Sequence, residues 1–328
     1  MSSQLKSDLI KLNDGNSMPA VGLGTFQGNY DYTSTFDRVV AAVTSALDIG
    51  YRHFDTAWIY DTESGVGTAL KARMKEGAVS REELFVTTKL WCPYHRTEEV
   101  VPALKRSLEK LGLYYVDMFL VHWPMAMPVT PPDVIWPKDE QGNVLFDDDR
   151  TSLLDCWKGM EECKRLGLAK SIGLSNCNQR QIQMVLDNCE IKPSNHQVEG
   201  HPHFQNRRLV DFCNKHGIVT TCFSPLGKPS RAWAKEGDPS LFTDETIAAI
   251  AKKHSKTPAQ IALKYQVQRG LAVVPKSNTP ARQRENLDIF DFELSSEDLE
   301  ALKACDKNFR VLWLDLLRGS TEYPFNED

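Results

Sequence analysis

The chain has 328 residues, of which 41% are hydrophobic and 25% are charged, with a formal net charge of -5 and a pI near 5.9. This modest negative charge argues against nucleic acid or an anionic membrane as the main partner, so we expect a small-molecule ligand. The sequence contains no run of about 18 apolar residues, and its start, MSSQLKSDLIKLNDG, has neither a long apolar core nor a small-residue cleavage site. We therefore expect an unexported, cytoplasmic protein.

The eight cysteines are scattered and contain no Cys-x-x-Cys pair. A chain of this length does not need disulfides to be stable, so we expect reduced thiols that act as small core residues.

The chain begins with two short extended runs around an Asn-Asp-Gly turn, residues 10–19, which predict a β-hairpin ahead of the main fold. An apolar strand follows at 21–26. The next segment, 36–50, places Val39, Val43, Ala46 and Leu47 on one face of a helix, with Gly50 as its C-cap. The first unit is therefore a strand followed by a helix.

The same alternation continues along the chain and gives eight strands. Further strands are predicted at 53–55, 85–89, 116–122, 169–175, 195–199, 218–224 and 271–276, and helices at 65–77, 98–112, 152–167, 179–188, 207–216, 243–254 and 258–269.

Eight alternating units predict an α/β fold of the (β/α)8 TIM-barrel class in one domain, residues 1–328, because strands joined through helices lie parallel. An open, doubly wound sheet is the alternative. Against it, the segment nearest to a dinucleotide fingerprint, Gly22-Leu-Gly24-Thr-Phe-Gln27, has glutamine where the third glycine belongs.

Polar residues stand at the carboxyl ends of seven predicted strands, the face on which barrel enzymes build their sites. They are Asp55, Lys89, His122, Ser175 with Asn176, Gln197, Ser224 and Lys276. Two long insertions, about 125–150 and 226–242, are predicted to form loops over the same face.

Asp55 and Tyr60 leave one strand end together, and this arrangement calls for a cation between them. A carboxylate at the end of an apolar strand is costly unless it is paired, and a phenol loses its proton near neutral pH only beside positive charge. Lys89 is the best candidate. A buried structural ion pair is the alternative interpretation of Asp55 and Lys89, and a core imidazole that of His122.

The last unit carries two cations and a hydroxyl, Lys276, Ser277 and Arg282, near a strand-to-helix turn. A helix N-terminus adds partial positive charge at this point, so the pattern predicts a site for a phosphate monoester. A solvated helix start is the alternative interpretation.

In combination, these motifs resemble the aldo-keto reductase family over nearly the whole chain. They are Asp55-TAWI-Tyr60, Lys89, His122-Trp-Pro, Gly173-LSN, Gln197-VE, Ser224-PLG and Lys276-S-NTPA-Arg282-QR-Glu285-Asn286. The resemblance implies an NADP-dependent oxidoreductase that passes a hydride from NADPH to an aldehyde or ketone, with Tyr60 as general acid, Asp55 and Lys89 tuning it, and His122 binding the substrate oxygen.

The resemblance also implies which residues hold NADPH. The 2′-phosphate end is assigned to Lys276, Ser277, Asn278, Arg282, Glu285 and Asn286, and the nicotinamide to Ser175, Asn176 and Gln197, with Phe223 stacked beneath the ring. Ribose and pyrophosphate fall to Thr25 and to the backbone around Ser224 and Leu226.

We expect an apolar substrate pocket for which the candidate walls are Phe26, Trp58, Trp91, Trp123, Ile135, Trp136, Leu312 and Trp313. Phe26 replaces a tryptophan that is common in the family. The tail, ending RGSTEYPFNED, is predicted to fold across the mouth of the barrel. The resemblance extends the substrate class to steroid-like ketones such as 3-dehydroecdysone, and its default state is a monomer.

The sequence leaves three alternatives to compare with this interpretation. His201-Pro-His203 offers two imidazoles but no further metal ligands at useful spacing, so no metal site is predicted. A short-chain dehydrogenase needs a Tyr-x-x-x-Lys pair, which the sequence lacks. A non-catalytic protein that binds NADPH on the same fold stays open.

Overall fold

Eight parallel strands form one curled sheet in the order β10-β9-β8-β7-β6-β5-β4-β3 in the computed structural model, which describes residues 5–28, 32–129, 134–229 and 231–326. The strands are β3 (Leu23–Gly24), β4 (His53–Asp55), β5 (Phe85–Leu90), β6 (Val116–Val121), β7 (Ala169–Ser175), β8 (Asn195–Glu199), β9 (Val219–Phe223) and β10 (Ala272–Val273).

The first and last strands join and close the sheet into a barrel. The Gly22 amide donates to the Val273 carbonyl at 2.9 Å, the Val273 amide donates to the Ala20 carbonyl at 2.8 Å, and Gly24 forms a parallel bridge with Lys276. This closure confirms the predicted (β/α)8 barrel and excludes the open sheet. Both end strands are shorter than predicted. The last strand, predicted to reach Lys276, ends at Val273, and Pro275 beyond it has no N–H with which to continue the ladder.

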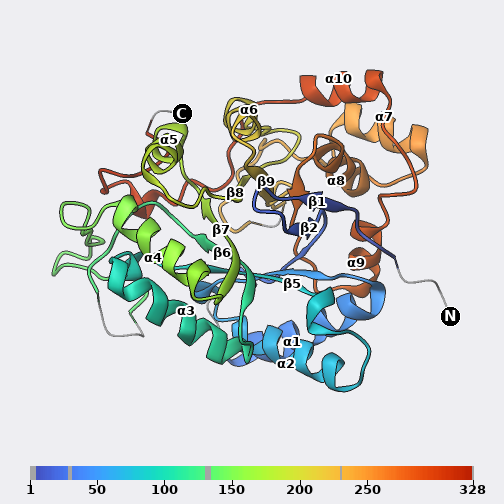
Figure 1. The fold of residues 1–328 in the computed structure, drawn as a ribbon. Helices are drawn as coiled ribbons and strands as arrows, with labels where there is room; N and C mark the ends of the chain where they lie inside the picture. Colours follow the sequence, from blue (N-terminus) through green and yellow to red (C-terminus); the bar gives the residue numbers. More distant parts are fainter. Residues whose placement is uncertain (1–4, 29–31, 130–133, 230, 327–328) are drawn as a thin grey trace.

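Helices surround the barrel on the outside (Figure 1). They are α1 (Tyr32–Ile49), α2 (Glu63–Lys75), α3 (Thr97–Leu111), α4 (Leu153–Arg165), α5 (Gln179–Asn188), α6 (Arg207–Lys215), α7 (Glu245–His254), α8 (Pro258–Gln268), α9 (Pro280–Leu287) and α10 (Ser296–Ala304). Helix α9 packs on both α1 and α8, so the helical layer closes at the same place as the sheet.

One of these helices, α10, was not predicted, and α9 was expected only as a helix start. Ser295 and Asp298 form a capping box at the N-terminus of α10, which is a signal that the sequence does contain. The helix is nine residues long with weak apolar periodicity, and its buried Leu302 packs in a cluster with residues of α7 and α8. Tertiary contacts rather than local pattern therefore stabilise it.

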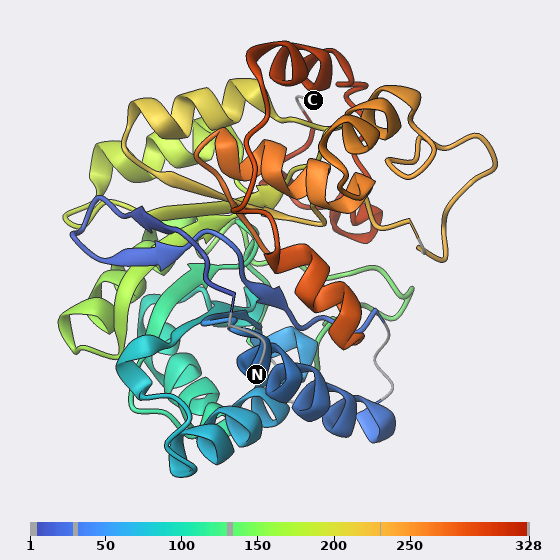
Figure 2. The same cartoon turned by 90° about the vertical axis from the view of Figure 1, so that its right-hand side faces the viewer.

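The predicted N-terminal hairpin is present as β1 (Leu9–Lys11) paired antiparallel with β2 (Ser17–Pro19). Its turn requires Gly15, whose φ of +90° is accessible to glycine at little cost. Leu12 and Met18 pack against Phe85 and Met118, which lie near the amino ends of their strands. The hairpin therefore covers the end of the barrel opposite to the strand carboxyl ends, and Figure 2 shows it, in dark blue, against the strands.

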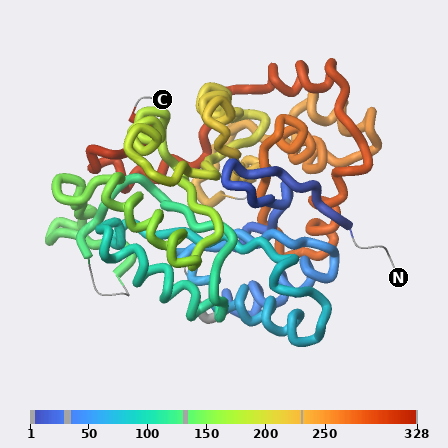
Figure 3. The backbone as a smooth tube through the Cα atoms, in the orientation of Figure 1, coloured from blue at the N-terminus to red at the C-terminus, as the bar shows by residue number. Residues whose placement is uncertain are grey.

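The C-terminal segment, residues 309–326, follows α10, runs past α6 and ends beside α5, as the labels of Figure 1 and the red end of the tube in Figure 3 show together. The amide of Val311 donates to Glu199 at the carboxyl end of β8, and Phe325 packs edge-on against Trp123 at a centroid distance of 5.7 Å. The tail thus crosses the face on which the strands end, as predicted. No helix in the described part of the chain is long and apolar enough to span a membrane.

Candidate active site

The carboxyl ends of β4, β5 and β6 bring together three of the polar residues singled out from the sequence. Asp55 ends β4, Lys89 lies near the end of β5, and His122 directly follows β6. All three side chains are at least 93% buried. Because parallel strands are in register, residues more than 30 positions apart share one small volume.

Lys89 and Asp55 form a buried ion pair at the centre of this group. The ammonium donates to Asp55 Oδ1 at 2.6 Å and to the carbonyl of Thr56 at 2.9 Å, and Gln197 donates its amide to Asp55 Oδ2 at 2.7 Å. Burial lowers the pKa of Lys89, and the Asp55 carboxylate opposes that effect. The pair is therefore held by hydrogen bonds on both of its members.

Tyr60 lies next to this pair, on a 3-10 turn η1 (Trp58–Tyr60) that follows β4. The Lys89 ammonium stands 5.0 Å from the centroid of its ring, and the Tyr60 hydroxyl is 3.4 Å from His122 Nε2. Burial, and secondarily the charge of Lys89, lowers the pKa of His122 well below its usual value, so this imidazole is neutral near pH 7. The four residues that were predicted to act together are therefore in one cluster.

Asn176 offers a hydrogen-bond acceptor beside the cluster. Its φ is +55°, and its amide donates to the His122 carbonyl at 3.0 Å and to Ser175 Oγ at 3.1 Å. Asn176 Oδ1 is buried and has no hydrogen-bond partner among the described residues. A buried orphan acceptor is costly, so this atom is suited to an amide donor from a ligand.

A cationic edge lies at the end of the last strand. Lys276 and Arg282 form no ion pair within the described part of the chain, and Arg282 is exposed on α9. Burial and the nearby Arg38 of α1 lower the pKa of Lys276, so a second positive charge lies close to its ammonium. Ser277 orders the short loop between Lys276 and α9, because its hydroxyl accepts the Thr279 amide at 3.1 Å.

Several predicted cofactor residues are already engaged within the protein. Gln197 donates to Asp55, Glu285 accepts from the hydroxyl of Thr257 at 2.7 Å, and Asn278 donates to Gln27 at 2.8 Å. Thr25 donates its hydroxyl to the Asp55 carbonyl at 2.9 Å. Phe223 and Ser224 are half-buried at the end of β9, and Asn286 is buried on α9.

Aromatic side chains lie next to the cluster. The Trp91 indole donates to the carbonyl of Ile135 at 2.9 Å and packs edge-on against Trp136 and His122, at 4.9 and 5.5 Å between centroids. Phe26 contacts the Tyr60 ring at 5.0 Å. Trp58 instead packs against Tyr94 at 5.4 Å. Trp136 of the insertion and Phe325 of the tail thus pack on Trp91 and Trp123, respectively, whereas residues 130–133 of the predicted insertion lie outside the described residues.

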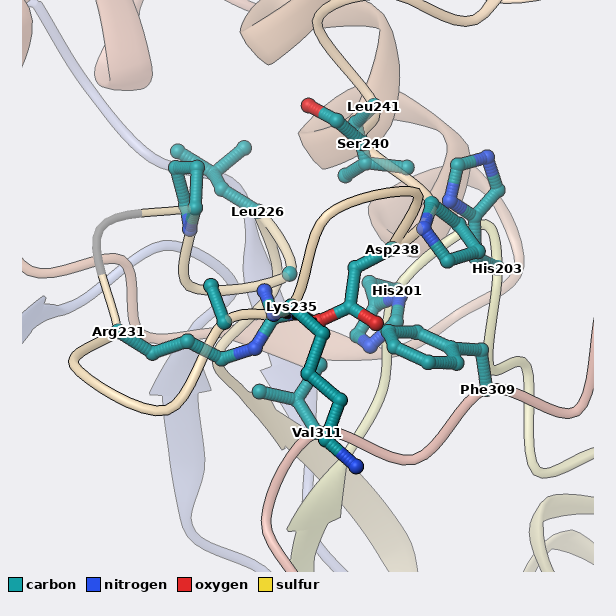
Figure 4. Close-up of a pocket in the computed structure, with 14 residues that line it drawn as sticks. His201, His203, Leu226, Arg231, Lys235, Asp238, Ser240, Leu241, Phe309 and Val311 are labelled. Carbon is teal, nitrogen blue, oxygen red and sulfur yellow. Dashed lines mark hydrogen bonds and ion pairs between the residues drawn. The ribbon is translucent and has the colours of Figure 1, made fainter.

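A separate cavity of about 160 Å³ lies under the 226–242 loop, between the turn after β8 and the tail. Figure 4 shows Arg231 and Asp238, which form an ion pair, pointing toward one another beside His201 and Phe309. His201 pairs with Glu199 at 3.0 Å and His203 with Asp244 at 2.9 Å. Each imidazole thus has its own carboxylate partner, and no group of three or more potential metal ligands occurs within the described ranges.

Sequence reasoning missed two cations near the site. Arg38 lies on α1, more than 200 positions from Lys276, and no local pattern distinguishes it from a solvated helix residue. Lys228 follows β9 with a φ of +45°, and its ammonium stands 4.3 Å from the Trp233 ring and 5.5 Å from the Phe26 ring. A lysine in a loop gives no signal of such contacts before the fold is known.

The fold and the cluster define a parallel α/β barrel with a buried group of ionisable side chains at the strand carboxyl ends. The model of the Aldo/keto reductase family matches residues 20–307. Aldo-keto reductase family 1 member C1 of Homo sapiens is 43% identical over 326 residues, which cover 98% of this chain and 99% of that protein.

Solved structures agree with these sequence matches. The aldose reductase from Schistosoma japonicum has a TM-score of 0.89 and 40% identity, and the Bombyx mori aldo-keto reductase in complex with NADP has a TM-score of 0.87 and 40% identity. Each comparison covers 98% of this chain and 99% of the other. The chain belongs to the aldo/keto reductase family.

Proposed function

We propose that the protein is an NADPH-dependent reductase of aldehydes or ketones. The observation that carries this proposal is the cluster of Tyr60, Lys89, Asp55 and His122, in which a phenol, a buried cation with its carboxylate and a neutral imidazole share one site. Such a set has the groups needed to protonate an oxygen atom while a carbonyl carbon is reduced.

Two features fit a nicotinamide cofactor. Asn176 Oδ1, buried without a partner among the described residues, can accept a hydrogen bond from a carboxamide, with Ser175 next to it. Lys276 and Arg282, without carboxylate partners in the described part of the chain, suit a phosphate monoester. The similar Bombyx mori structure carries NADP. When bound, the reduced form of this cofactor, NADPH, would supply the hydride.

The other predicted cofactor residues keep supporting roles in this proposal. Phe223 would stack on the nicotinamide ring, and Thr25, Ser224 and Leu226 would lie along the ribose and pyrophosphate. Ser277, Asn278, Glu285 and Asn286 would order the loop and helix that carry Lys276 and Arg282. Gln197 would position Asp55 in addition to facing the cofactor.

Each residue of the cluster has a distinct role in the proposed reaction. Tyr60 donates its proton to the substrate oxygen, because a cation beside a phenol lowers the phenol's pKa. Asp55 keeps the Lys89 ammonium charged in a site where burial favours its neutral form. His122, neutral near pH 7, orients the substrate oxygen through a hydrogen bond.

We also propose that the substrate is apolar around its carbonyl group. Phe26, Trp91 and Trp123 stand next to the cluster, and the insertion at 125–150 and the tail add further aromatic surface. Walls drawn from separate segments suit a bulky ketone, such as a ketosteroid, better than a small polar sugar.

Substituting Tyr60→Phe tests the function. We expect kcat for carbonyl reduction to fall by about 100-fold or more, because the ring remains but the acid is gone, while NADPH still binds. Turnover is followed by NADPH absorbance with a panel of aldehydes, quinones, sugars and ketosteroids, and binding is followed by NADPH fluorescence.

Equal activity in the mutant would refute Tyr60 as the acid. A wild-type protein that binds NADPH but reduces no member of the panel would favour the non-catalytic alternative.

A further inference from the structure

Three buried threonine hydroxyls form a continuous chain behind the ion pair of the cluster. Thr56 Oγ1 and Thr62 Oγ1 are 2.8 Å apart, Thr62 Oγ1 and Thr25 Oγ1 are 2.9 Å apart, and Thr25 Oγ1 donates to the Asp55 carbonyl at 2.9 Å. The three side chains are at most 2% exposed. Water therefore does not compete for these hydrogen bonds.

The geometry fixes which hydroxyl donates and which accepts in each of these hydrogen bonds. A hydroxyl has one proton to donate, and that of Thr25 is used on the Asp55 carbonyl. Thr25 must then accept from Thr62, and Thr62 in turn must accept from Thr56. Both hydrogen bonds between threonines depend on Thr62, which accepts from Thr56 and donates to Thr25.

Thr62 takes part in this chain in place of a common local role. It is the N-cap residue of α2, where a threonine side chain normally accepts an amide of the first turn, yet its side chain makes no capping hydrogen bond. Its φ of -108° and ψ of -7° differ from the extended conformation typical of a capping residue. The hydroxyl is directed instead toward the ends of β3 and β4.

Thr62 thereby joins the two halves of the cluster. On one side it follows Tyr60 by two residues, through Asp61, whose φ of +51° ends the turn that carries the phenol. On the other side its hydrogen bonds reach Thr56 and, through Thr25, the Asp55 carbonyl. Asp55 and Thr56 are the two residues that hold the Lys89 ammonium.

We infer that Thr62 is a positioning residue for the proposed reduction: its hydroxyl fixes the turn that carries Tyr60 relative to the strand end that holds Lys89. This inference rests on the proposed function, because it concerns how the acid and its cation are aligned. Small displacements between reacting groups are costly in rate, and a shift of about 1 Å can reduce turnover by about 100-fold.

Several charged or titratable groups of the described residues lie around Tyr60 and bear on its pH behaviour. Lys89 and His122 are in contact with it, and Asp55 pairs with Lys89. Glu63 lies behind Lys89 on α2 and acts on its charge, and on the outer side Asp61 pairs with Lys110 at 3.5 Å. None of these groups is altered by a substitution at Thr62.

The test is Thr62→Val, which keeps the shape of the side chain and removes both hydrogen bonds. We expect kcat to fall by about 10-fold to 100-fold, with the KM for the carbonyl substrate and the affinity for NADPH unchanged. The alkaline limb of the kcat profile should move to higher pH, because an acid less well aligned with Lys89 is weaker. Thr62→Ser, which restores the hydroxyl, should recover the wild-type kcat and pH profile.

Matched variants keep the test decisive. Thr56→Val removes only the link at the donor end and should reduce kcat less than Thr62→Val does. If Thr62→Val does not fold, as judged by circular dichroism and NADPH binding, Thr62→Ala removes the hydroxyl without adding a methyl group and carries the same expectation.

A Thr62→Val or Thr62→Ala enzyme with wild-type kcat and pH profile would overturn the inference, and so would a Thr62→Ser enzyme as slow as the valine variant. These outcomes are separable from failure of the proposed function. Wild-type turnover that is lost in Tyr60→Phe establishes the function whatever Thr62 does.

Discussion

The electrostatics of the site depend on single charges whose partners the fold selects. Lys89 is buried and paired with Asp55, whereas Lys276 and Arg282 have no carboxylate partner within the described residues. A paired cation is neutralised and can act on the phenol only at short range. Unpaired cations at a helix start are available to a ligand phosphate.

This difference predicts the effect of Arg282→Ala. We expect the Kd for NADPH to rise by about tenfold or more, because a charge-assisted hydrogen bond to the 2′-phosphate is lost, while the Kd for NADH stays unchanged. Fluorescence titration with NADPH and with NADH measures the two Kd values and hence their ratio.

Arg284→Ala is the matched control, because Arg284 is also exposed on α9 but two positions away and so faces another direction. An Arg282→Ala protein with an unchanged preference for NADPH over NADH would contradict the assignment of the 2′-phosphate.

The carboxylate of Glu199 binds the C-terminal segment where that segment begins to cross the barrel, and further hydrogen bonds from Asn178 and Gln181 hold its end. Glu199, at the end of β8, accepts the amides of Val311 at 2.6 Å and Leu312 at 2.7 Å, and Trp233 donates to the Val311 carbonyl at 3.1 Å. The backbone N–H and C=O of Val311 therefore both form hydrogen bonds. The path of the backbone at Val311 and Leu312 therefore depends on Glu199.

The substitution Glu199→Gln should loosen the tail. One carboxylate oxygen is replaced by an amide group that cannot accept an N–H, at a cost of about 1.5–3 kcal/mol for a hydrogen bond to a charged group. Arg310 is 94% buried in the wild type, so limited trypsin digestion should cut after Arg310 faster in the variant, as mass spectrometry of the released peptide would show.

Arg318 serves as the internal reference, because half of its side chain is already exposed. Equal protection of Arg310 in the two proteins would contradict the role of Glu199.

In the whole molecule, burial keeps several histidine side chains unprotonated. Burial lowers the pKa of His95 and of His196 to about 3. The unfolded chain binds protons on these residues with the ordinary histidine pKa of about 6.5, so between about pH 6.5 and 3 it carries protons that the folded chain lacks. Folding stability from this source therefore falls as the pH is lowered through 6.5.

His95→Leu should reduce this dependence. Neither ring nitrogen of His95 has a hydrogen-bond partner among the described residues, so leucine removes a titrating group without breaking a bond. Between pH 7 and 5 we expect the variant to lose about 2 kcal/mol less unfolding free energy than the wild type. Urea denaturation of both proteins at pH 7 and at pH 5 measures these unfolding free energies. The two proteins should change in parallel between pH 8 and 7, and parallel change down to pH 5 would contradict the prediction.

Two expectations about the molecule as a whole stay predictions. They are that residues 1–328 form a single domain and that the protein is a monomer, and each depends on how the chain behaves in solution. The barrel closure between Gly24 and Lys276 is compatible with the first.

The eight strand–helix units, the hairpin and the residues at the strand ends could all be predicted from the amino-acid sequence. These features are local: an apolar run of four to seven residues and a 3.6-residue periodicity are written into neighbouring positions. Because parallel strands place their carboxyl ends together, Asp55, Lys89 and His122 could be predicted to meet once a barrel was inferred.

The hydrogen-bond partners of these residues, by contrast, depend on how the chain folds in three dimensions. Gln197 donates to Asp55 from 142 positions away, Arg38 lies beside Lys276, and Thr62 leaves its capping role for two other threonines. No local pattern predicts such contacts, because they exist only when strands far apart in sequence are brought into register. The chemical groups of the site could therefore be predicted from the sequence, whereas the hydrogen bonds between them depend on the closed barrel.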